Sequence, residues 1–159
     1  HDTKIFWSRG NGWVFAGLTN ILNELDQTSE AYRYFLDIYI KMADKLLTLQ
    51  TPEGHWAMSL LGQEFYTTPE TSGSSFFIYG MAWGIRSGLL PATTYQKIVD
   101  KGWKAIDSCV QPIGFLAYVQ GTGKEPKDGQ PVTKTSVPNF EDFGLGCYLL
   151  AGSEILKAK

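Results

Sequence analysis

Cysteine, histidine and excess charge are all scarce in this sequence, which has two Cys, two His and a formal net charge of −2 over 159 residues. With so little excess charge of either sign, nothing predicts a nucleic-acid partner or binding to a membrane surface. Cys109 and Cys147 lie far apart, each within an apolar stretch, so we expect two buried thiols rather than a disulfide. A zinc site formed by His55 and these cysteines would lack the usual ligand spacing. We therefore expect no metal and no cofactor.

Long apolar runs are also missing. No stretch of the sequence approaches the length needed to cross a membrane, and no signal peptide opens the chain. The first residue is not Met, and a dense motif follows almost at once, so we expect the chain to be part of a larger protein. Its length is that of a single domain, residues 1–159, which is enough to bury a substantial core.

Aromatic residues are plentiful, at 14% of the chain, and include five Trp. Sugars present apolar C–H faces that stack on flat rings, so this composition is compatible with a carbohydrate site. It is equally compatible with a large aromatic core.

Five helices of two alternating kinds are predicted. Residues 14–25, 73–87 and 141–156 are apolar nearly all round, whereas 29–50 and 92–110 each have one apolar stripe. A helix that is apolar on every side must be covered on every side. We therefore expect an all-α fold of two layers, with the helices at 14–25, 73–87 and 141–156 in the inner layer and those at 29–50 and 92–110 in the outer layer.

The segments between the helices carry further signals. Thr28 or Ser29 is expected to cap the second helix. Residues 112–138 are rich in Gly, Pro and Lys and favour a hairpin. A polar, turn-rich entry precedes each inner helix, in "RGNGWVFAGLTNIL", "TSGSSFFIYGMAWGI" and "FEDFGLGCYLLAGSEIL". The three entries should lie at the same end of the layer, where a site would form.

The stretch "IFWSRGNGW", residues 5–13, places one arginine between two tryptophans and two glycines. Two explanations are open at this point. The first is a surface shaped for a ligand. The second is a tight turn in which Arg9 pairs with a structural carboxylate while Trp7 and Trp13 fill the core.

Together, "FWSRGNGW", "ETSGSSFFIYGMAWGIRSGLL" and "FEDFGLGCYLLAGSE" resemble the C-terminal half of the unsaturated glucuronyl and rhamnogalacturonyl hydrolases, glycoside hydrolase families 88 and 105. The resemblance covers essentially the whole chain and is closer to family 105. It implies an (α/α)6 toroid of helical hairpins, of which this chain would be a partial toroid of about five main helices.

The resemblance also implies an activity. These bacterial enzymes of carbohydrate metabolism, pectin degradation included, remove a 4,5-unsaturated uronic acid from the non-reducing end of an oligosaccharide made by a lyase. An Asp protonates C4, water adds at C5, and the resulting hemiketal collapses. In the family the catalytic Asp precedes the arginine motif, whereas only His1 and Asp2 precede it here. We therefore expect no catalytic residue in this chain, and no activity from the chain alone.

Binding residues carry over from the arginine motif. Arg9 matches the arginine that contacts substrate, and Trp7 and Trp13 match the tryptophans that shape the sugar pocket. Gly10 and Gly12 would let the backbone approach ligand and a neighbouring helix closely.

Weaker candidates lie at the start of the third helix. Glu70, Ser72 and Ser74 could reach a sugar at the same mouth, although Glu70 and Thr71 more often cap such a helix. The adjacent carboxylates of Glu141 and Asp142 do not share a helix face and are expected to be helix-start charge.

Two wider questions stay open at this stage. A non-catalytic helical carbohydrate-binding or scaffold module is the alternative to an enzyme fragment. The first and last helices would expose apolar flanks, which predicts a homodimer or contact with a missing N-terminal half. The compartment, bacterial cytoplasm or periplasm, is undetermined.

Overall fold

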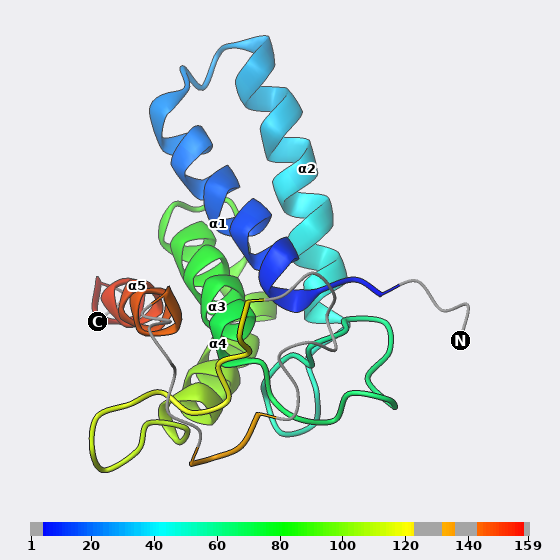
Figure 1. Cartoon of the computed structure of the whole chain (residues 1–159). Coiled ribbons are helices and arrows are strands. Elements are labelled where there is room, and N and C mark those ends of the chain that lie inside the picture. Colours follow the sequence, from blue (N-terminus) through cyan, green and yellow to red (C-terminus); the bar gives the residue numbers. More distant parts are fainter. Residues whose placement is uncertain (1–4, 123–131, 136–142, 158–159) are drawn as a thin grey trace.

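The computed structural model describes residues 5–122, 132–135 and 143–157. Five α-helices make up most of this part of the chain: α1 (Ser8–Glu24), α2 (Glu30–Leu47), α3 (Thr71–Arg86), α4 (Ala92–Asp107) and α5 (Phe143–Lys157). The described residues form three isolated β-bridges and no β-strand. The predicted all-α fold is thus confirmed (Figure 1).

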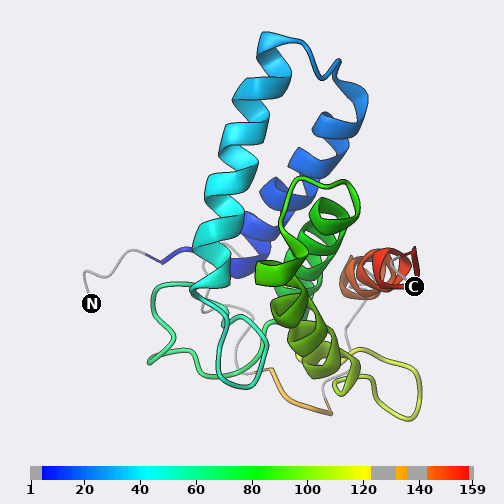
Figure 2. The ribbon, with the colours of Figure 1, turned by 180° about the vertical axis from the view of Figure 1, so that it is seen from behind.

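Helix α3 lies at the centre of the arrangement. It packs against α1, α4 and α5, while α2 packs on α1. Seen from behind, α4 lies in front of α3 (Figure 2). Every residue from Thr71 to Gly84 is buried, which confirms that this helix is covered on all sides. The alternation of inner helices (α1, α3 and α5) with outer helices (α2 and α4) therefore agrees with the sequence pattern.

Small residues on α3 let its neighbours come close. A Cβ atom at Gly80 would overlap the ring of Phe15, and one at Gly84 would overlap the hydroxyl of Tyr39. The rings of Phe15 and Tyr39 stack with centroids 5.0 Å apart, and the Tyr39 hydroxyl donates a 2.7 Å hydrogen bond to the Gly80 carbonyl. These two glycines thus allow α1 and α2 to fill the inner core with aromatic side chains.

The start of α1 corrects one expectation. The helix begins at Ser8, six residues before the predicted start at residue 14, so Arg9, Gly10, Gly12 and Trp13 lie on the helix rather than ahead of it. Gly12 faces α3, and a Cβ there would lie 3.1 Å from Phe76. The close packing that glycine allows at this point outweighs its poor helix propensity.

The helix caps agree with the sequence more closely. Ser29 caps α2, because its Oγ accepts a 3.0 Å hydrogen bond from the Tyr32 backbone N–H. The Glu70 carboxylate caps α3 by accepting from the backbone N–H groups of Ser72 and Gly73. Both fit the general preference for an oxygen-bearing side chain at this position.

One other expectation needs correction. Helix α4 ends at Asp107 rather than at residue 110, because the chain turns there. An isolated antiparallel bridge joins Val110 to Leu116 at the start of the stretch where a hairpin was expected, residues 112–138, of which 123–131 and 136–138 lie outside the described residues. The Gln111 N–H donates to the Phe115 carbonyl, which closes a tight turn without a strand ladder.

The two terminal inner helices expose apolar side chains, as the sequence pattern predicted. Cys147 and Ala151 of α5 are buried, but one flank of that helix faces outward, as does a flank of α1. The exposed apolar residues on these flanks are Trp13, Val14, Ile21, Leu145, Leu149, Leu150 and Leu156. Cys109 and Cys147 are free and buried, which confirms the expected thiols. No helix in the described part of the chain is long and apolar enough to cross a membrane.

Candidate functional site

The first residues of the three inner helices meet at one end of the layer. The guanidinium carbon of Arg9, on α1, lies 4.5 Å from the ring centroid of Phe143, on α5. On α3, a Cβ added at Gly73 would overlap the Ser8 Oγ and the Arg9 backbone nitrogen of α1. The expectation that the three polar entries share one end is thus confirmed, although Glu141 and Asp142 lie outside the described residues.

Arg9 is held between two aromatic rings and two carbonyl groups. The residue is almost fully buried, with an exposed fraction of 3%. The ring centroid of Trp7 also lies 4.5 Å from its guanidinium carbon, an arrangement typical of cation–π contacts. One terminal nitrogen donates to the Gln120 carbonyl, and the other donates to the Gly121 carbonyl at 3.1 Å. Among the described residues, the hydrogen bonds of this cation thus go to backbone oxygens.

Glu70 is the charged neighbour of Arg9 and has no exposed surface. Its carboxylate accepts from the Ser72 hydroxyl at 2.5 Å and from the Gly73 N–H at 2.6 Å, and it also bonds the backbone of Gln120. Burial raises the pKa of Glu70, although the hydrogen bond from Ser72 and the charge of Arg9 act in the opposite direction. Glu70 and Ser72 therefore face each other within the protein interior.

Gln120 joins this group and was missed by the sequence analysis. Its side chain is fully buried, and its Oε1 accepts a 2.8 Å hydrogen bond from the Trp7 indole Nε1. Thr71 holds the segment in place, because its hydroxyl donates to the Ala117 carbonyl at 2.8 Å and its N–H to the Tyr118 carbonyl at 3.2 Å. Gln120 follows a stretch with no helical period, so no sequence signal marked it.

The remaining predicted site residues lie at different depths. Trp13 is 53% exposed, and its ring packs on Phe76 with centroids 4.5 Å apart. In the part of the chain that the structure describes, the nearest neighbour of a Cβ added at Gly10 would be the Trp7 Cβ, at 3.9 Å. Ser74 is buried, and its Oγ accepts a 2.9 Å hydrogen bond from the Trp56 N–H. Ser74 thus fastens the loop before α3.

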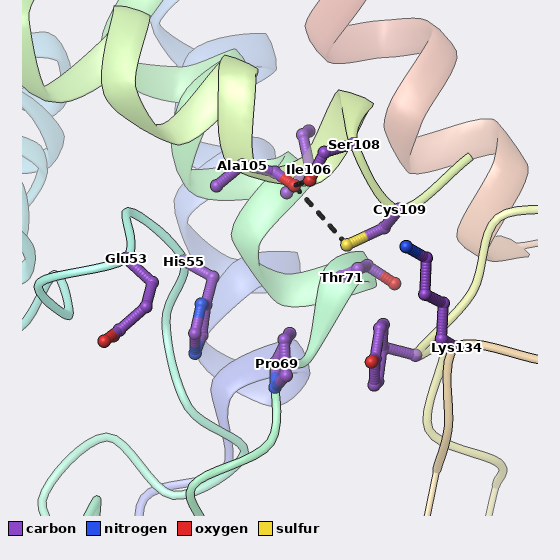
Figure 3. A pocket seen from close by; sticks show the side chains of 10 residues that line it. Glu53, His55, Pro69, Thr71, Ala105, Ile106, Ser108, Cys109 and Lys134 are labelled. Atoms are coloured by element: carbon purple, nitrogen blue, oxygen red, sulfur yellow. Dashed lines mark hydrogen bonds between the residues drawn. The ribbon is translucent and has the colours of Figure 1, made fainter. Parts of the chain in front are cut away.

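A hollow of about 360 Å³ lies between the start of α3 and the end of α4 (Figure 3). His55, Thr71, Cys109 and Tyr118 are among the residues that line it. The Cys109 thiol donates to the Ala105 carbonyl at 3.4 Å, and burial raises its pKa, so the thiol is not an activated nucleophile. Tyr118 has a φ of 58°, which is uncommon for a residue with a side chain.

His55 in this hollow is a buried imidazole. Within the described part of the chain, its Nε2 atom has no hydrogen-bond partner, while the ring bonds the backbone of Thr67. Burial lowers its pKa below the ordinary value of 6.5, and Lys101 adds to this effect. The imidazole is therefore neutral near pH 7.

This depressed pKa predicts a loss of stability in acid. Below pH 6.5 the unfolded chain binds a proton at His55 that the folded chain does not, so unfolding becomes easier as the pH falls toward the folded pKa. The slope approaches roughly 1.4 kcal/mol per pH unit at most. Urea unfolding at pH 5 to 7 should show this slope, and His55→Gln should remove it. Equal slopes in both proteins would contradict the assignment, since contributions from other groups cancel in the difference.

The chain is similar to known proteins over nearly its whole length. The profile of Glycosyl Hydrolase Family 88 matches residues 1–159. A relative from Formosa agariphila, named unsaturated 3S-rhamnoglycuronyl hydrolase, is 39% identical over 157 residues, which are 99% of this chain and 40% of that protein. A solved structure titled glycosyl hydrolase family 88 from Bacteroides vulgatus is 37% identical with a TM-score of 0.89, and the match covers 98% of this chain and 44% of that one.

A further solved structure, titled a polysaccharide lyase, is 38% identical with a TM-score of 0.88 and has the same coverage. A possible member of family 105 from Salmonella enterica, 23% identical, shares the fold with a TM-score of 0.80. The five helices are therefore helical hairpins of an (α/α)6 toroid, and the expected partial toroid is confirmed. The chain spans less than half the length of the relatives it matches.

Proposed function

Because the chain belongs to glycosyl hydrolase family 88, we propose that the whole protein removes a 4,5-unsaturated uronic acid from lyase-generated oligosaccharides. It hydrates the double bond, and the hemiketal then releases the sugar. The observation that carries this proposal is the cation of Arg9, set between the Trp7 and Phe143 rings where the three inner helices begin. A planar, anionic sugar ring needs such a cation beside a flat apolar surface.

Each candidate residue then takes a part in binding. Arg9 has five N–H donors, and two of its nitrogens bond the Gln120 and Gly121 carbonyls; we assign a remaining donor to the uronate carboxylate. The exposed ring of Trp13 stacks on the sugar, and Gly10 leaves room for the ligand above the start of α1. The general acid, an Asp, comes from the rest of the protein.

The sign of an absorbance change tests the proposal. The unsaturated uronate absorbs in the ultraviolet, so a hydrolase consumes this signal, whereas a lyase, the activity named in one structural title, generates it. We expect the whole protein to consume the signal and the 159-residue chain alone to leave it unchanged. Sugar binding by the whole protein without any change in absorbance would favour the non-catalytic module. Turnover by the chain alone would show that the general acid lies within it.

Arg9 provides the sharpest substitution. Arg9→Lys keeps the charge but loses the planar fork, so it should lower kcat/KM in the whole protein about a hundredfold, mainly by raising KM. Arg33→Lys is the matched control, because Arg33 is an exposed arginine that also donates to a carbonyl, that of Thr28. Undiminished activity of Arg9→Ala on an unsaturated disaccharide would refute the role in binding. Unfolding of Arg9→Ala would instead indicate a structural role.

The exposed flanks of α1 and α5 lead us to propose an interaction surface. In the whole protein these flanks, apart from Trp13 at the sugar site, face the remaining helices of the toroid. The isolated chain covers them by pairing with a second copy, because an apolar face of this kind is costly in water. Light scattering of the chain should give twice 17.7 kDa, and Leu149→Lys should weaken the pairing. A cooperatively melting monomer of 17.7 kDa would disprove this surface.

A further inference from the structure

Gln120 contacts Trp7, Arg9 and Glu70, each through a different group. Its side-chain Oε1 accepts from the Trp7 indole at 2.8 Å. Its backbone carbonyl accepts from the Arg9 guanidinium. Its backbone also bonds the buried carboxylate of Glu70. One residue from a loop thus connects α1 with the start of α3.

We propose that Gln120 is a positioning residue that sets the Trp7 ring and the Arg9 guanidinium in the orientation that receives the sugar. The proposal rests on the proposed function, since it concerns the same binding site. It assigns a role in substrate recognition to a residue that need not touch the substrate itself.

The orientation of the Trp7 ring is the first step of the argument. An indole N–H is a donor without acceptor capacity, and leaving it unpaired in a buried place is costly. The Gln120 side chain is fully buried, so its Oε1 satisfies this donor where water has little access. Because the Trp7 ring centroid lies 4.5 Å from the Arg9 guanidinium carbon, a tilt of the ring changes the contact with the cation.

The fixed backbone of Gln120 is the second step. The Arg9 guanidinium takes its direction from two successive carbonyls, those of Gln120 and Gly121. These carbonyls are immobilised because Thr71 bonds the backbone of Ala117 and Tyr118 immediately before them. The side chain of Gln120 therefore orients the Trp7 ring, and its backbone carbonyl orients the neighbouring Arg9 guanidinium.

Gln120→Met tests the role of the hydrogen bond to Trp7. Methionine has a side chain of similar length but no amide oxygen to accept from the Trp7 indole. In the whole protein, KM for an unsaturated uronyl disaccharide should rise about tenfold while kcat changes by less than about threefold, because binding is lost in ground and transition states alike. The indole N–H resonance of Trp7 in a ¹H–¹⁵N NMR spectrum should move, since its hydrogen bond is gone.

A double-mutant cycle separates positioning from simple stabilisation. Trp7→Phe removes the indole donor, so in that background Gln120→Met should change KM by less than about twofold. Gln50→Met is the matched control, because Gln50 donates to the carbonyls of Gly54 and Ile98 away from Arg9. This control should lower the melting temperature and leave KM unchanged. If Gln120→Met does not fold, Gln120→Leu, which likewise has no acceptor oxygen, should raise KM and displace the Trp7 resonance in the same way.

The outcomes separate this proposal from the proposed function. An unchanged KM in folded Gln120→Met, or an equal rise in KM in the Trp7→Phe background, would overturn the positioning role. An unchanged KM and an unmoved Trp7 resonance in folded Gln120→Leu would overturn it as well, because the acceptor is absent there too. If the unmodified protein does not consume the unsaturated sugar, the proposed function fails. The Trp7 resonance of Gln120→Met then decides the positioning role: a displaced signal supports it and an unmoved one refutes it.

Discussion

The buried carboxylate of Glu70 is the constraint on which the rest of the site depends. A carboxylate without exposed surface is unfavourable unless donors surround it. Glu70 meets this demand with the first backbone N–H groups of α3, the Ser72 hydroxyl and the backbone of Gln120. The helix dipole adds a favourable field at the same point. Satisfying one buried charge thus fixes the start of α3 and the loop segment beside it.

The orientation of Arg9 depends on the same loop segment. The segment that bonds Glu70 also presents the two carbonyls that receive the guanidinium, and Phe143 and Trp7 supply its aromatic neighbours. Burial raises the pKa of the nearby Cys147 thiol to about 12; the charge of Glu70 raises it too, while that of Arg9 lowers it. Cys147 is thus close enough to sense both charges, yet stays a protonated thiol that fills space.

The sequence predicted the parts of this architecture that local rules control. Glu70 was expected to cap a helix because a carboxylate before an apolar run does so in isolation, and α3 was expected to be buried because no side of it is polar. The start of α1 was mispredicted because its glycines have poor helix propensity, whereas Gly12 is helical through contact with Phe76 on α3. Gln120 was missed for a related reason. Its three partners are distant in sequence, and neither period nor composition reveals such contacts.

The position of the candidate site within the partial toroid explains how its residues could act together with residues from the rest of the protein. Helix α3 has an inner neighbour on each side within this chain, whereas α1 and α5 each have one and leave their other flanks apolar and exposed. The candidate site extends from the start of α3 toward both of those flanks, to Trp13 on α1 and Phe143 on α5. Under the proposed function, the general acid belongs to helices that cover the same flanks. Packing of those helices on α1 and α5 would then bring the acid to the edge of the candidate site that Arg9 and Gln120 define. Burial of the flanks and assembly of the catalytic site would thus be one event, driven by the hydrophobic effect.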